Sequence, residues 1–472
     1  MKLLPFLIFF FLCIASINAE ISSRLGVNYG QLGNNLPTPH RSIQLIQSLN
    51  ASRVKIYDTN PEILRSISHT NLQISIMLPN ELISNVSSNQ SFSDHWIRLN
   101  VLPFADSAGI RYLLVGNEVL SPFSAAAARR TWLDLVPAMR RISKTLKKLK
   151  ILKIKVSTPL AIDCIQSVSP PSNGTFRPDI AEPIIRPLLQ FLNRTRSYFA
   201  IDAYPYFVWS ANHTNIRLDY ALGNRDEKNL TYADPVSGLS YTNLLDEMLD
   251  AVVFAMRRLG FRNVRLMVAE TGWPTAGDFD QIGANIYNAA TYNRNLVKKF
   301  TARPAVGTPA RPGAVIPVFV FALYNENQKP GPTTERNWGL LYPNGTRVYG
   351  VDLSGRNPEW DKEVLPKPGN NEPYKGKVWC VVRSDVAVNE TKLGEAIAYA
   401  CGQGSGTCDA IQPGRECYEP NTLVAHASYA FGSYWVQFRG AGGTCFFDGL
   451  AVQTIRDPSN GPCRYPSVTL SG

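Results

Sequence analysis

Histidine is scarce in this chain of 472 residues, which contains only five, and the motifs of several enzyme classes are missing. There is no His-Glu-x-x-His zinc motif, no Gly-x-x-x-x-Gly-Lys phosphate loop and no Gly-x-Ser-x-Gly nucleophile elbow. No Gly-x-Gly-x-x-Gly sequence follows the first predicted strand, which argues against a dinucleotide-binding fold. The sequence therefore implies no metal and no cofactor.

Beyond its first residues the chain lacks any apolar run long enough to cross a membrane. Residues 1–19 place one lysine before a run of Leu, Ile and Phe that closes on small residues. This pattern predicts a secretory signal peptide cleaved after Ala19, because the run is shorter than the ~20 residues that a span needs. The end of the chain, SVTLSG, has no hydrophobic tail, so we expect no C-terminal lipid anchor. We predict a secreted protein of the extracellular space or cell wall.

Cysteine is rare before residue 380, where only Cys13 and Cys164 occur. For Cys164 we expect a buried, inert thiol. Six further cysteines follow within a short segment, and an even number in an exported segment is typical of a disulfide framework, with fifteen pairings open. No pair has Cys-x-x-Cys spacing, so zinc is not indicated. The six are Cys380, Cys401, Cys408, Cys417, Cys445 and Cys463.

Apolar residues make up 44% of the chain and charged residues 18%, which is the composition of a globular protein, and the formal net charge is +11. Such a charge permits binding to nucleic acid, anionic membranes or acidic polysaccharide and selects none of them. Nine Asn-x-Ser/Thr sequons accompany the signal peptide, which favours an exported, surface-glycosylated protein for which nucleic acid is a poor partner. We expect it to be a monomer. The sequons begin at Asn50, Asn85, Asn89, Asn173, Asn193, Asn212, Asn229, Asn344 and Asn389.

The length suggests more than one domain, at ~100–200 residues per domain. In residues 357–377 Pro, Gly, Asn and Lys dominate and apolar periodicity disappears, which indicates a linker. We therefore predict a large domain over residues 20–350, a linker over 351–377 and a small disulfide-stapled module over 378–465.

The large domain alternates strand-like apolar runs with helical patterns. Most runs are near-continuous in apolar residues, which is typical of strands buried on both faces of a parallel sheet. Helical patterns cover residues 128–150 and 242–260, and we expect the second to begin at a Thr242 cap and to end at Gly260. Eight strands with intervening helices predict an α/β fold, the (β/α)₈ TIM barrel, with a doubly wound open sheet as the alternative. The predicted strands are residues 25–30, 53–58, 73–79, 110–119, 153–160, 198–206, 265–274 and 315–327.

Acidic residues stand at the ends of several predicted strands, where a TIM barrel places its catalytic residues. Several carboxylates with aromatic residues beside them suit glycoside hydrolysis, which needs one carboxylic acid to protonate the leaving oxygen and one carboxylate opposite it. Aromatic faces suit the apolar faces of sugar rings. These considerations do not by themselves select the pair. The acidic residues are Asp58, Glu118, Asp202, Glu270 and Glu326.

Long motifs spread over residues 25–345 resemble those of plant glycoside hydrolase family 17, the β-1,3-glucanases. In chain order they are GVNYGQLGNNLP (26–37), VGNEV (115–119), YPYF (204–207), VAETGWPTAG (268–277), ANIYNAATYN (284–293) and FALYNENQKPGPTTERNWGL (321–340). The resemblance implies a (β/α)₈ barrel that cleaves β-1,3-glucan internally with retention of configuration.

Carried over residue by residue, the resemblance implies that Glu118 is the general acid/base on the fourth strand and Glu270 the nucleophile on the seventh. Thr271 stands where Ser is common in the family, and Asn117 would hold the 2-hydroxyl of the sugar. In a polar cluster near the cleft, Lys329 would favour the ionised forms of its carboxylate neighbours. The substrate-binding candidates beside Asn117 are Tyr57, Tyr204 and Phe207 as sugar platforms, and Glu326, Lys329 and Glu335 as that polar cluster.

The tail resembles carbohydrate-binding module family 43, which binds β-1,3-glucan. The motifs are WCVVRSD (379–385), AIAYACGQGSGTCDAI (396–411), PNTLVAHASYAFGSYW (420–435) and TCFFDGLA (444–451). The resemblance implies the disulfides Cys380–Cys445, Cys401–Cys408 and Cys417–Cys463. The aromatic residues that must supply both its core and its sugar contacts are Trp379, Tyr399, Tyr429, Phe431, Tyr434 and Trp435.

The function predicted from the sequence is that of a secreted plant-type endo-β-1,3-glucanase with a glucan-binding tail, acting on callose-like wall polymer. Two alternatives stay open. One is a wall protein that binds glucan but turns it over little. The other is a glucan transglucosylase, which shares the covalent intermediate and passes the sugar to a hydroxyl instead of water.

Overall fold

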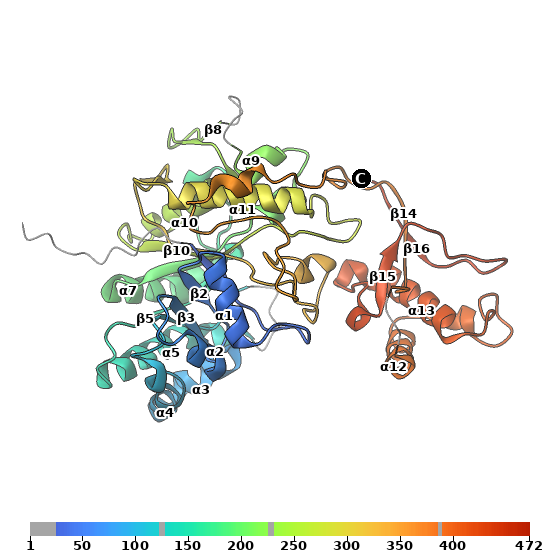
Figure 1. The fold of residues 1–472 in the computed structure, drawn as a ribbon, viewed down its shortest axis with the longest axis horizontal. Helices are drawn as coiled ribbons and strands as arrows, with labels where there is room; N and C mark the ends of the chain where they lie inside the picture. The colour runs from blue at the N-terminus through green and yellow to red at the C-terminus, as the bar shows by residue number, and fades with distance from the viewer. Residues whose placement is uncertain (1–24, 122–127, 225–230, 386–388) are drawn as a thin grey trace, which may run out of the picture.

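The computed structural model describes residues 25–121, 128–224, 231–385 and 389–472. The predicted signal peptide over residues 1–19 and the sequon at Asn229 lie outside these ranges. Buried apolar residues form a large cluster and a small inner one in the barrel, and a separate cluster in the C-terminal module. In Figure 1 the C-terminal module, drawn in red, lies to one side of the barrel. Among the described residues no helix combines the length and the apolar character that crossing a bilayer requires.

The large domain is built on one parallel sheet whose strands run in the order β5-β4-β3-β2-β1-β13-β10-β7-β6. β5 pairs with β4 and β6 pairs with β7, while β5 and β6 flank the single residue Thr158. The two ends of the sheet are therefore consecutive pieces of one segment, which closes the barrel. The (β/α)₈ prediction is confirmed, and the open-sheet alternative is excluded. The strands are β1 Gly26–Asn28, β2 Arg53–Lys55, β3 Gln73–Leu78, β4 Ile110–Val115, β5 Lys155–Ser157, β6 Pro159–Ala161, β7 Tyr198–Asp202, β10 Arg265–Thr271 and β13 Val318–Val320.

Helices cover the outside of the barrel (Figure 1). α10 shows how the sequence sets their ends. Its N-cap is Asn243, whose side chain accepts a hydrogen bond from the Asp246 N–H at 2.9 Å, so the predicted Thr242 cap is wrong by one residue. Gly260 follows the helix with φ +90°, as a C-terminal glycine does. The helices are α1 Pro39–Ser48, α2 Pro61–Ile67, α3 Ile83–Ser88, α4 Gln90–Asn100, α5 Ala128–Lys148, α6 Pro178–Ile180, α7 Arg186–Thr195, α8 Pro205–Ala211, α9 Leu218–Leu222, α10 Leu244–Arg258 and α11 Ile286–Thr301.

Alternate residues of the strands point into the barrel, because side chains in a strand alternate between its two faces. In β7, Tyr198 and Ala200 belong to the inner cluster of buried residues, while Phe199 and Ile201 pack with the outer one. This inner layer fills the barrel beneath the strand ends. Two short antiparallel pairs lie in the connecting loops. β8 Tyr232–Ala233 pairs with β9 Ser240–Tyr241 between α9 and α10, and β11 Gly307–Thr308 pairs with β12 Arg311–Pro312 between α11 and β13.

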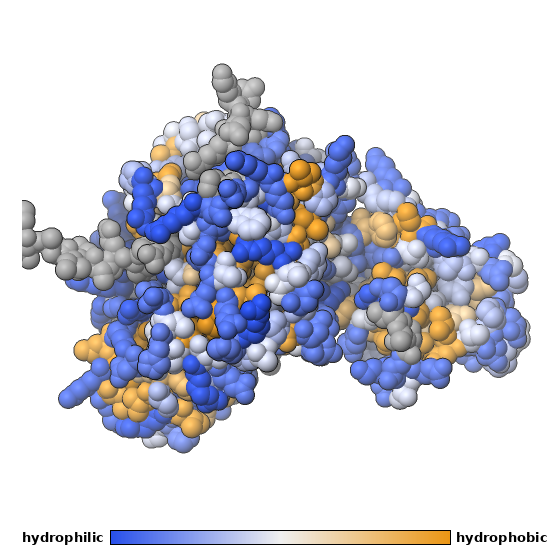
Figure 2. Space-filling view, in the orientation of Figure 1, coloured by the Kyte–Doolittle hydropathy of each residue, from blue (hydrophilic) through white to orange (hydrophobic). Residues whose placement is uncertain are grey.

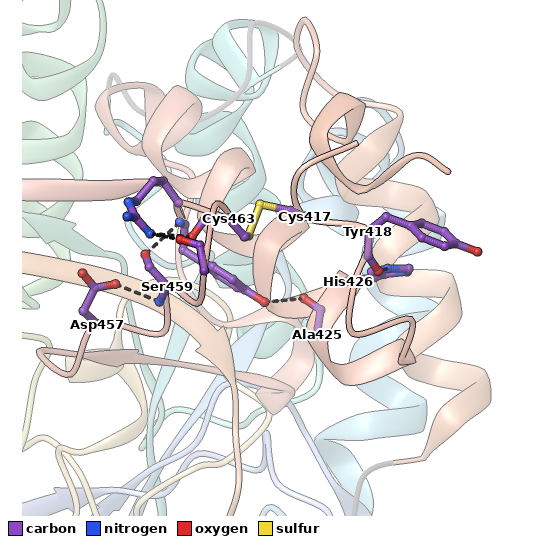
Figure 3. Close-up of a disulfide and its surroundings, with 10 residues drawn as sticks. Cys417, Tyr418, Ala425, His426, Asp457, Ser459 and Cys463 are labelled. Atoms are coloured by element: carbon purple, nitrogen blue, oxygen red, sulfur yellow. Dashed lines mark hydrogen bonds between the residues drawn. A yellow bond between two sulfur atoms is a disulfide. The ribbon is translucent and has the colours of Figure 1, made fainter. Parts of the chain in front are cut away.

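In the C-terminal module α13 Leu423–Phe438 packs against a three-stranded antiparallel sheet, and α12 Glu390–Cys401 packs against α13. In that sheet β14 Gly376–Val382 lies between β15 Ala451–Thr454 and β16 Ser467–Leu470. The disulfides join Cys380 to Cys445, Cys401 to Cys408 and Cys417 to Cys463, the pairs that the resemblance implied. Figure 3 shows the Cys417–Cys463 bridge, with Tyr418 and His426 near it, whose ring planes are tilted by 37° to each other. These bridges suit a module too small to rely on its apolar core alone.

The aromatic residues of the module divide into two groups. Phe431 and Trp435 are buried in its core, and Trp379 is buried but lies outside that core. Tyr399 is 53% exposed, and its ring lies against Tyr434, with ring centroids 5.7 Å apart. Exposed aromatic faces are available to sugars and buried ones are not, so the structure reduces the set of sugar-binding candidates.

The segment between the two parts lies along the barrel. Glu363 accepts hydrogen bonds from Arg294 at 2.6 Å and from the Gly350 N–H at 2.7 Å. Further on, the Asn370 carbonyl accepts from the Gly283 N–H at 2.7 Å, and Asn371 accepts from Asn288 at 2.7 Å. The segment is therefore held to the barrel at several points.

Hydrophilic residues cover most of the face drawn in Figure 2, on the barrel and on the module. The eight sequon asparagines within the described residues are all exposed. Cys164 is fully buried, and burial raises the pKa of its thiol, which makes it the inert thiol that the sequence predicted.

Candidate active site

A cavity of about 1150 Å³ opens at the carboxyl ends of the barrel strands. Side chains from the ends of β4, β7 and β10 line it together with residues of the loops that follow β1, β2 and β13. All nine of the predicted catalytic and substrate-binding residues line it. They are Tyr57, Asn117, Glu118, Tyr204, Phe207, Glu270, Glu326, Lys329 and Glu335.

A β-bulge turns Glu270 into the cavity. Val268 pairs with Ile201 and Glu270 pairs with Asp202, so Ala269 is an extra residue on β10. The Ala269 side chain already faces the barrel interior, and strict alternation would send the next side chain outward. The extra residue restores the inward direction at Glu270, which is a known use of bulges near active sites. The Asn28 amide donates to the Ala269 carbonyl at 3.0 Å and holds the bulge in place.

Three donors hold the Glu270 carboxylate. The Lys55 ammonium lies 2.6 Å from Oε1, and the Tyr57 hydroxyl donates to the same oxygen at 2.7 Å. The Tyr204 hydroxyl donates to Oε2 at 2.6 Å. Burial raises the pKa of Glu270, but Lys55 and the two hydroxyls outweigh burial and lower it below its ordinary value. The geometry therefore fixes an ionised, oriented carboxylate.

Glu118 sits just beyond the end of β4 on a clamped turn. The Asn80 side chain accepts from the Asn117 N–H at 2.7 Å and donates to the Asn117 carbonyl at 3.0 Å. Gly116 has φ +68°, and a Cβ there would lie 2.4 Å from Val119. Glu118 itself has φ +49°, a left-handed conformation that non-glycine residues seldom adopt and that recurs at functional sites.

The pKa of the Glu118 carboxyl is shifted in the opposite direction from that of Glu270. Burial first, and the negative charge of Glu270 second, raise its pKa to about 7. Lys55 opposes the rise, and the Lys55 ammonium lies 3.3 Å from Oδ1 of the adjacent Asn117. One cavity therefore holds a carboxyl that stays protonated in weak acid and a carboxylate that stays ionised, which is the division of labour of an acid/base pair.

Asp202 is a third buried carboxyl, at the end of β7 next to Glu270 in strand register. It is 2% exposed, and neither of its oxygens has a hydrogen-bond partner within the described ranges. Burial and the charge of Glu270 raise its pKa well above the ordinary value, against the effect of Lys55. Asp202 therefore holds its proton more tightly than an ordinary carboxyl does, beside the ionised Glu270.

The predicted polar cluster of Glu326, Lys329 and Glu335 lines the cavity. Lys329 lies 3.7 Å from Glu335, while the Glu326 carboxylate accepts from the Leu32 N–H at 2.8 Å. A Cβ at Gly30 would lie against the Glu326 carboxylate, so a larger residue there would displace that carboxylate. Burial raises the pKa of Glu326 more than Lys329 lowers it, so the expected ionising effect of Lys329 does not prevail at Glu326.

The aromatic candidates differ in what they do. Phe207 is 46% exposed and packs edge-on against Tyr204, with ring centroids 5.6 Å apart, and against Trp338 at 5.7 Å. Its free face is open to a sugar ring. Tyr57 and Tyr204 use their hydroxyls on Glu270, so they orient the carboxylate as well as shape the cavity.

Sequence reasoning missed Lys55 and named Asp202 only as one acidic strand end among five. A signal for Lys55 exists in the sequence, since it stands between Val54 and Ile56 in a predicted strand, and a buried lysine requires an anionic partner. Asp58 also lines the cavity, where its carboxylate accepts from Gln31 at 3.1 Å and from the Asn60 N–H at 3.0 Å.

Comparison with known proteins identifies the family. Residues 25–353, most of the chain, match glycosyl hydrolases family 17. The chain belongs to this family. Residues 378–452 match the X8 domain, the module recognised above as carbohydrate-binding module family 43.

Curated relatives and solved structures agree with the family match. The chain is 52% identical over 451 residues to probable glucan endo-1,3-beta-glucosidase A6 of Arabidopsis thaliana, covering 96% of this chain and 92% of the relative. It is 34% identical to the glucan endo-1,3-beta-D-glucosidase of Olea europaea, covering 95% of each. A β-1,3-glucanase and allergen of Cryptomeria japonica pollen, CJP38, superposes with a TM-score of 0.65 at 38% identity, over 70% of this chain and 99% of that one. One of two plant β-glucan endohydrolases with distinct substrate specificities superposes with a TM-score of 0.62 at 33% identity, over 70% of this chain and 100% of that one.

Proposed function

We propose that this protein is a retaining endo-β-1,3-glucanase, with Glu270 as the nucleophile and Glu118 as the general acid/base. The observation that carries the proposal is the contrast between two carboxyls in one cavity. Glu270 is ionised and held by three donors, while the pKa of Glu118 is raised to about 7. The family and the names of the relatives supply the substrate class.

In the first step the Glu270 carboxylate attacks the anomeric carbon while Glu118 gives its proton to the departing glycosidic oxygen. A covalent glucosyl ester forms on Glu270. Retention by this route requires the two carboxyl groups to stand ~5–5.5 Å apart. Asn117, whose side chain accepts from Lys55, is proposed to hold the sugar 2-hydroxyl beside the nucleophile.

In the second step Glu118 removes a proton from the incoming water. The water oxygen bonds to the anomeric carbon, the ester bond to Glu270 breaks, and the sugar is released. Forming the ester removes the negative charge of Glu270, which is the second-largest cause of the raised pKa of Glu118. Lys55, which lowers that pKa, is still present. The pKa of Glu118 therefore falls once its proton has been delivered, and this change turns the acid into a base.

The X8 module is proposed to bind the same β-1,3-glucan through its exposed aromatic face, near Tyr399 and Tyr434. The signal peptide, the exposed sequons and the three disulfides together support secretion to a plant cell wall, where callose-like polymer is the substrate. The remaining site candidates, Phe207, Glu326, Lys329 and Glu335, are proposed as substrate contacts in the cleft.

A transglucosylase uses the same ester and differs in its acceptor, so product analysis is the deciding experiment. Defined β-1,3- and mixed-linkage oligosaccharides are incubated with the protein, and the products are sized alongside a reducing-sugar assay. We expect shorter β-1,3 products, loss of turnover in Glu118→Gln and Glu270→Gln, and full turnover in Glu62→Gln, whose side chain is exposed on α2. Products longer than the substrate would establish the transglucosylase. Binding without turnover in the unaltered protein would establish a wall glucan-binding protein.

A further inference from the structure

The C-terminal module touches the barrel directly, apart from the chain that connects them. The Arg439 guanidinium lies 2.7 Å from the Asp280 carboxylate, and the Gln453 side chain accepts from the Phe279 N–H at 3.1 Å. The Arg336 guanidinium lies 3.5 Å from the centroid of the Phe446 ring. Charge pairing, a hydrogen bond and a cation–π contact thus join surfaces that are distant in sequence.

Two aromatic residues at this contact are unused by the core of their own domain. Phe446 is absent from the side chains packed against the apolar core of the module, unlike its neighbour Phe447. Phe279 is absent from those packed against the barrel core, and its ring lies 5.3 Å from that of Tyr374, which packs against the core of the module. A large apolar side chain that leaves its own core and meets the other domain is characteristic of an interface.

The barrel side of this contact is also the outer side of the cleft wall. Arg336 ends the short helix η6 Thr333–Arg336, and the preceding residue, Glu335, lines the cleft. The Arg336 guanidinium donates to the carbonyls of Lys329 at 3.1 Å and Gly331 at 2.9 Å. The side chain that meets the module therefore also holds the loop that carries Lys329 and Glu335 in the cleft.

The loop after β10 braces that wall from behind. The Asp278 carboxylate accepts from the Thr333 N–H at 3.0 Å and from the Thr333 hydroxyl at 2.6 Å. The Gln281 side-chain amide donates to the Thr334 hydroxyl at 2.7 Å. The next residues in this loop, Phe279 and Asp280, contact the module. The module thus rests on two loops that are tied to each other and that end at the cleft.

We propose that the module is docked on residues 278–281 and 333–336 as a fixed extension of the cleft wall, and that one long β-1,3-glucan chain contacts both parts. The proposal rests on the proposed function for the identity of the glucan, while the docking stands on the contacts alone. A docked module holds the polymer at one position and orientation relative to Glu118 and Glu270. A freely tethered module would supply only local concentration.

The test exchanges the charges of the Asp280–Arg439 pair in the full-length protein. Asp280→Arg and Arg439→Asp each place like charges at the contact, which disfavours it, and the double exchange restores opposite charges. Neither residue lines the cleft. Phe446→Ala removes the ring from the module side and leaves the hydrogen bonds of Arg336 to its own loop intact.

Two readouts are measured for every variant: the radius of gyration by small-angle scattering, and the ratio of rates on insoluble β-1,3-glucan and on a short oligosaccharide that cannot bridge both parts. We expect each single variant to expand the molecule and to lower the ratio by roughly threefold or more, through the insoluble substrate alone. The double exchange is expected to restore both values. Unchanged scattering in both single reversals, or no restoration in the double exchange, would overturn the docking.

Failure of the proposed function has a different signature. If the unaltered protein hydrolysed neither substrate, the glucanase assignment would fail, and scattering would still decide the docking. If the reversals expanded the molecule while the rate ratio stayed constant, the bridging glucan chain would be refuted.

Discussion

The Lys55 ammonium lies 2.6 Å from Oε1 of Glu270, and both side chains are buried. An ion pair removed from water is stable only when each charge is compensated and its remaining hydrogen-bonding groups are satisfied. Here Tyr57 and Tyr204 satisfy the carboxylate, and Asn117 accepts from the ammonium. Lys55 thereby keeps Glu270 ionised while the neighbouring acid, Glu118, stays protonated.

The pH dependence of kcat/KM follows from these two carboxyls. Glu118 must be protonated, so we expect activity to fall as the pH rises through about 7. Glu270 must be ionised and its pKa is lowered, so the acid limb is expected below the ordinary value of 4.5. A pH–rate profile on a soluble β-1,3-oligosaccharide measures both limbs. Constant activity from pH 6 to pH 9 would contradict the role of Glu118.

Replacing Lys55 by Met removes the charge that holds Glu270 ionised. We expect kcat to fall roughly 10²-fold or more, because a preorganised charge at the reacting group is lost. The acid limb is expected to move to higher pH, since the pKa of Glu270 is then raised by burial with less opposition. Steady-state kinetics across pH give both values. Tyr57→Phe serves as the matched variant, since it removes one hydroxyl contact and leaves the charge, and an equal loss in the two variants would argue against the charge.

Asp202→Asn tests whether the third carboxyl is neutral in the folded protein. The raised pKa means that the folded state binds this proton more tightly than the unfolded state does. Its stabilising effect is therefore present below the unfolded pKa and lost as the pH rises through the folded pKa. A carboxamide does not titrate, so we expect the variant to melt at a higher temperature than the unaltered protein at pH 8, with little difference at pH 4.

Thermal melts at the two pH values measure this effect, and Asp106→Asn, at a fully exposed carboxylate, is the control with no expected change. Activity of Asp202→Asn below pH 6 is expected to stay within roughly tenfold of the unaltered rate, equivalent to ~1.4 kcal/mol in the barrier. A stabilisation equal at both pH values would show that packing, and not proton binding, is responsible.

Phe207 is expected to act as a sugar platform. Its ring is 46% exposed in the cleft and is packed from behind by Tyr204 and Trp338. Phe207→Ala should raise KM about tenfold with little change in kcat, because an aromatic contact of ~1–1.5 kcal/mol is lost. Leu99→Ala, at a leucine that is 64% exposed on α4, is the control. A drop in kcat at constant KM would instead place the ring in the chemical step.

The barrel was predictable because its strands are buried on both faces and read as continuous apolar runs. All eight predicted strand positions hold strands, although most are shorter than predicted, and the strand over residues 153–160 is interrupted at Thr158. Helix ends were less certain: Asn243 and Thr242 are both good caps, and the sequence alone does not show which side chain reaches the Asp246 N–H.

The carboxyls could be located but their charge states could not. Strand-end position marks Glu118, Asp202 and Glu270 equally, whereas their pKa values depend on burial and on the partner across the barrel. Lys55 comes from β2 and Glu270 from β10, 215 residues away, and only barrel closure brings them together. The bulge at Ala269, which aims Glu270, leaves no mark in the apolar pattern. Likewise, Phe431 and Trp435 turn into the core of the module for reasons of packing that composition does not contain.

The most direct measurement is covalent trapping of the intermediate. A 2-deoxy-2-fluoro β-1,3-glucoside with a good leaving group slows release of the ester more than its formation, so the adduct accumulates and proteolysis with mass spectrometry locates it. A single added glycosyl mass on Glu270, absent in Glu270→Gln, is the predicted result. An adduct on another side chain, or inversion of the anomeric centre with no adduct, would contradict the account.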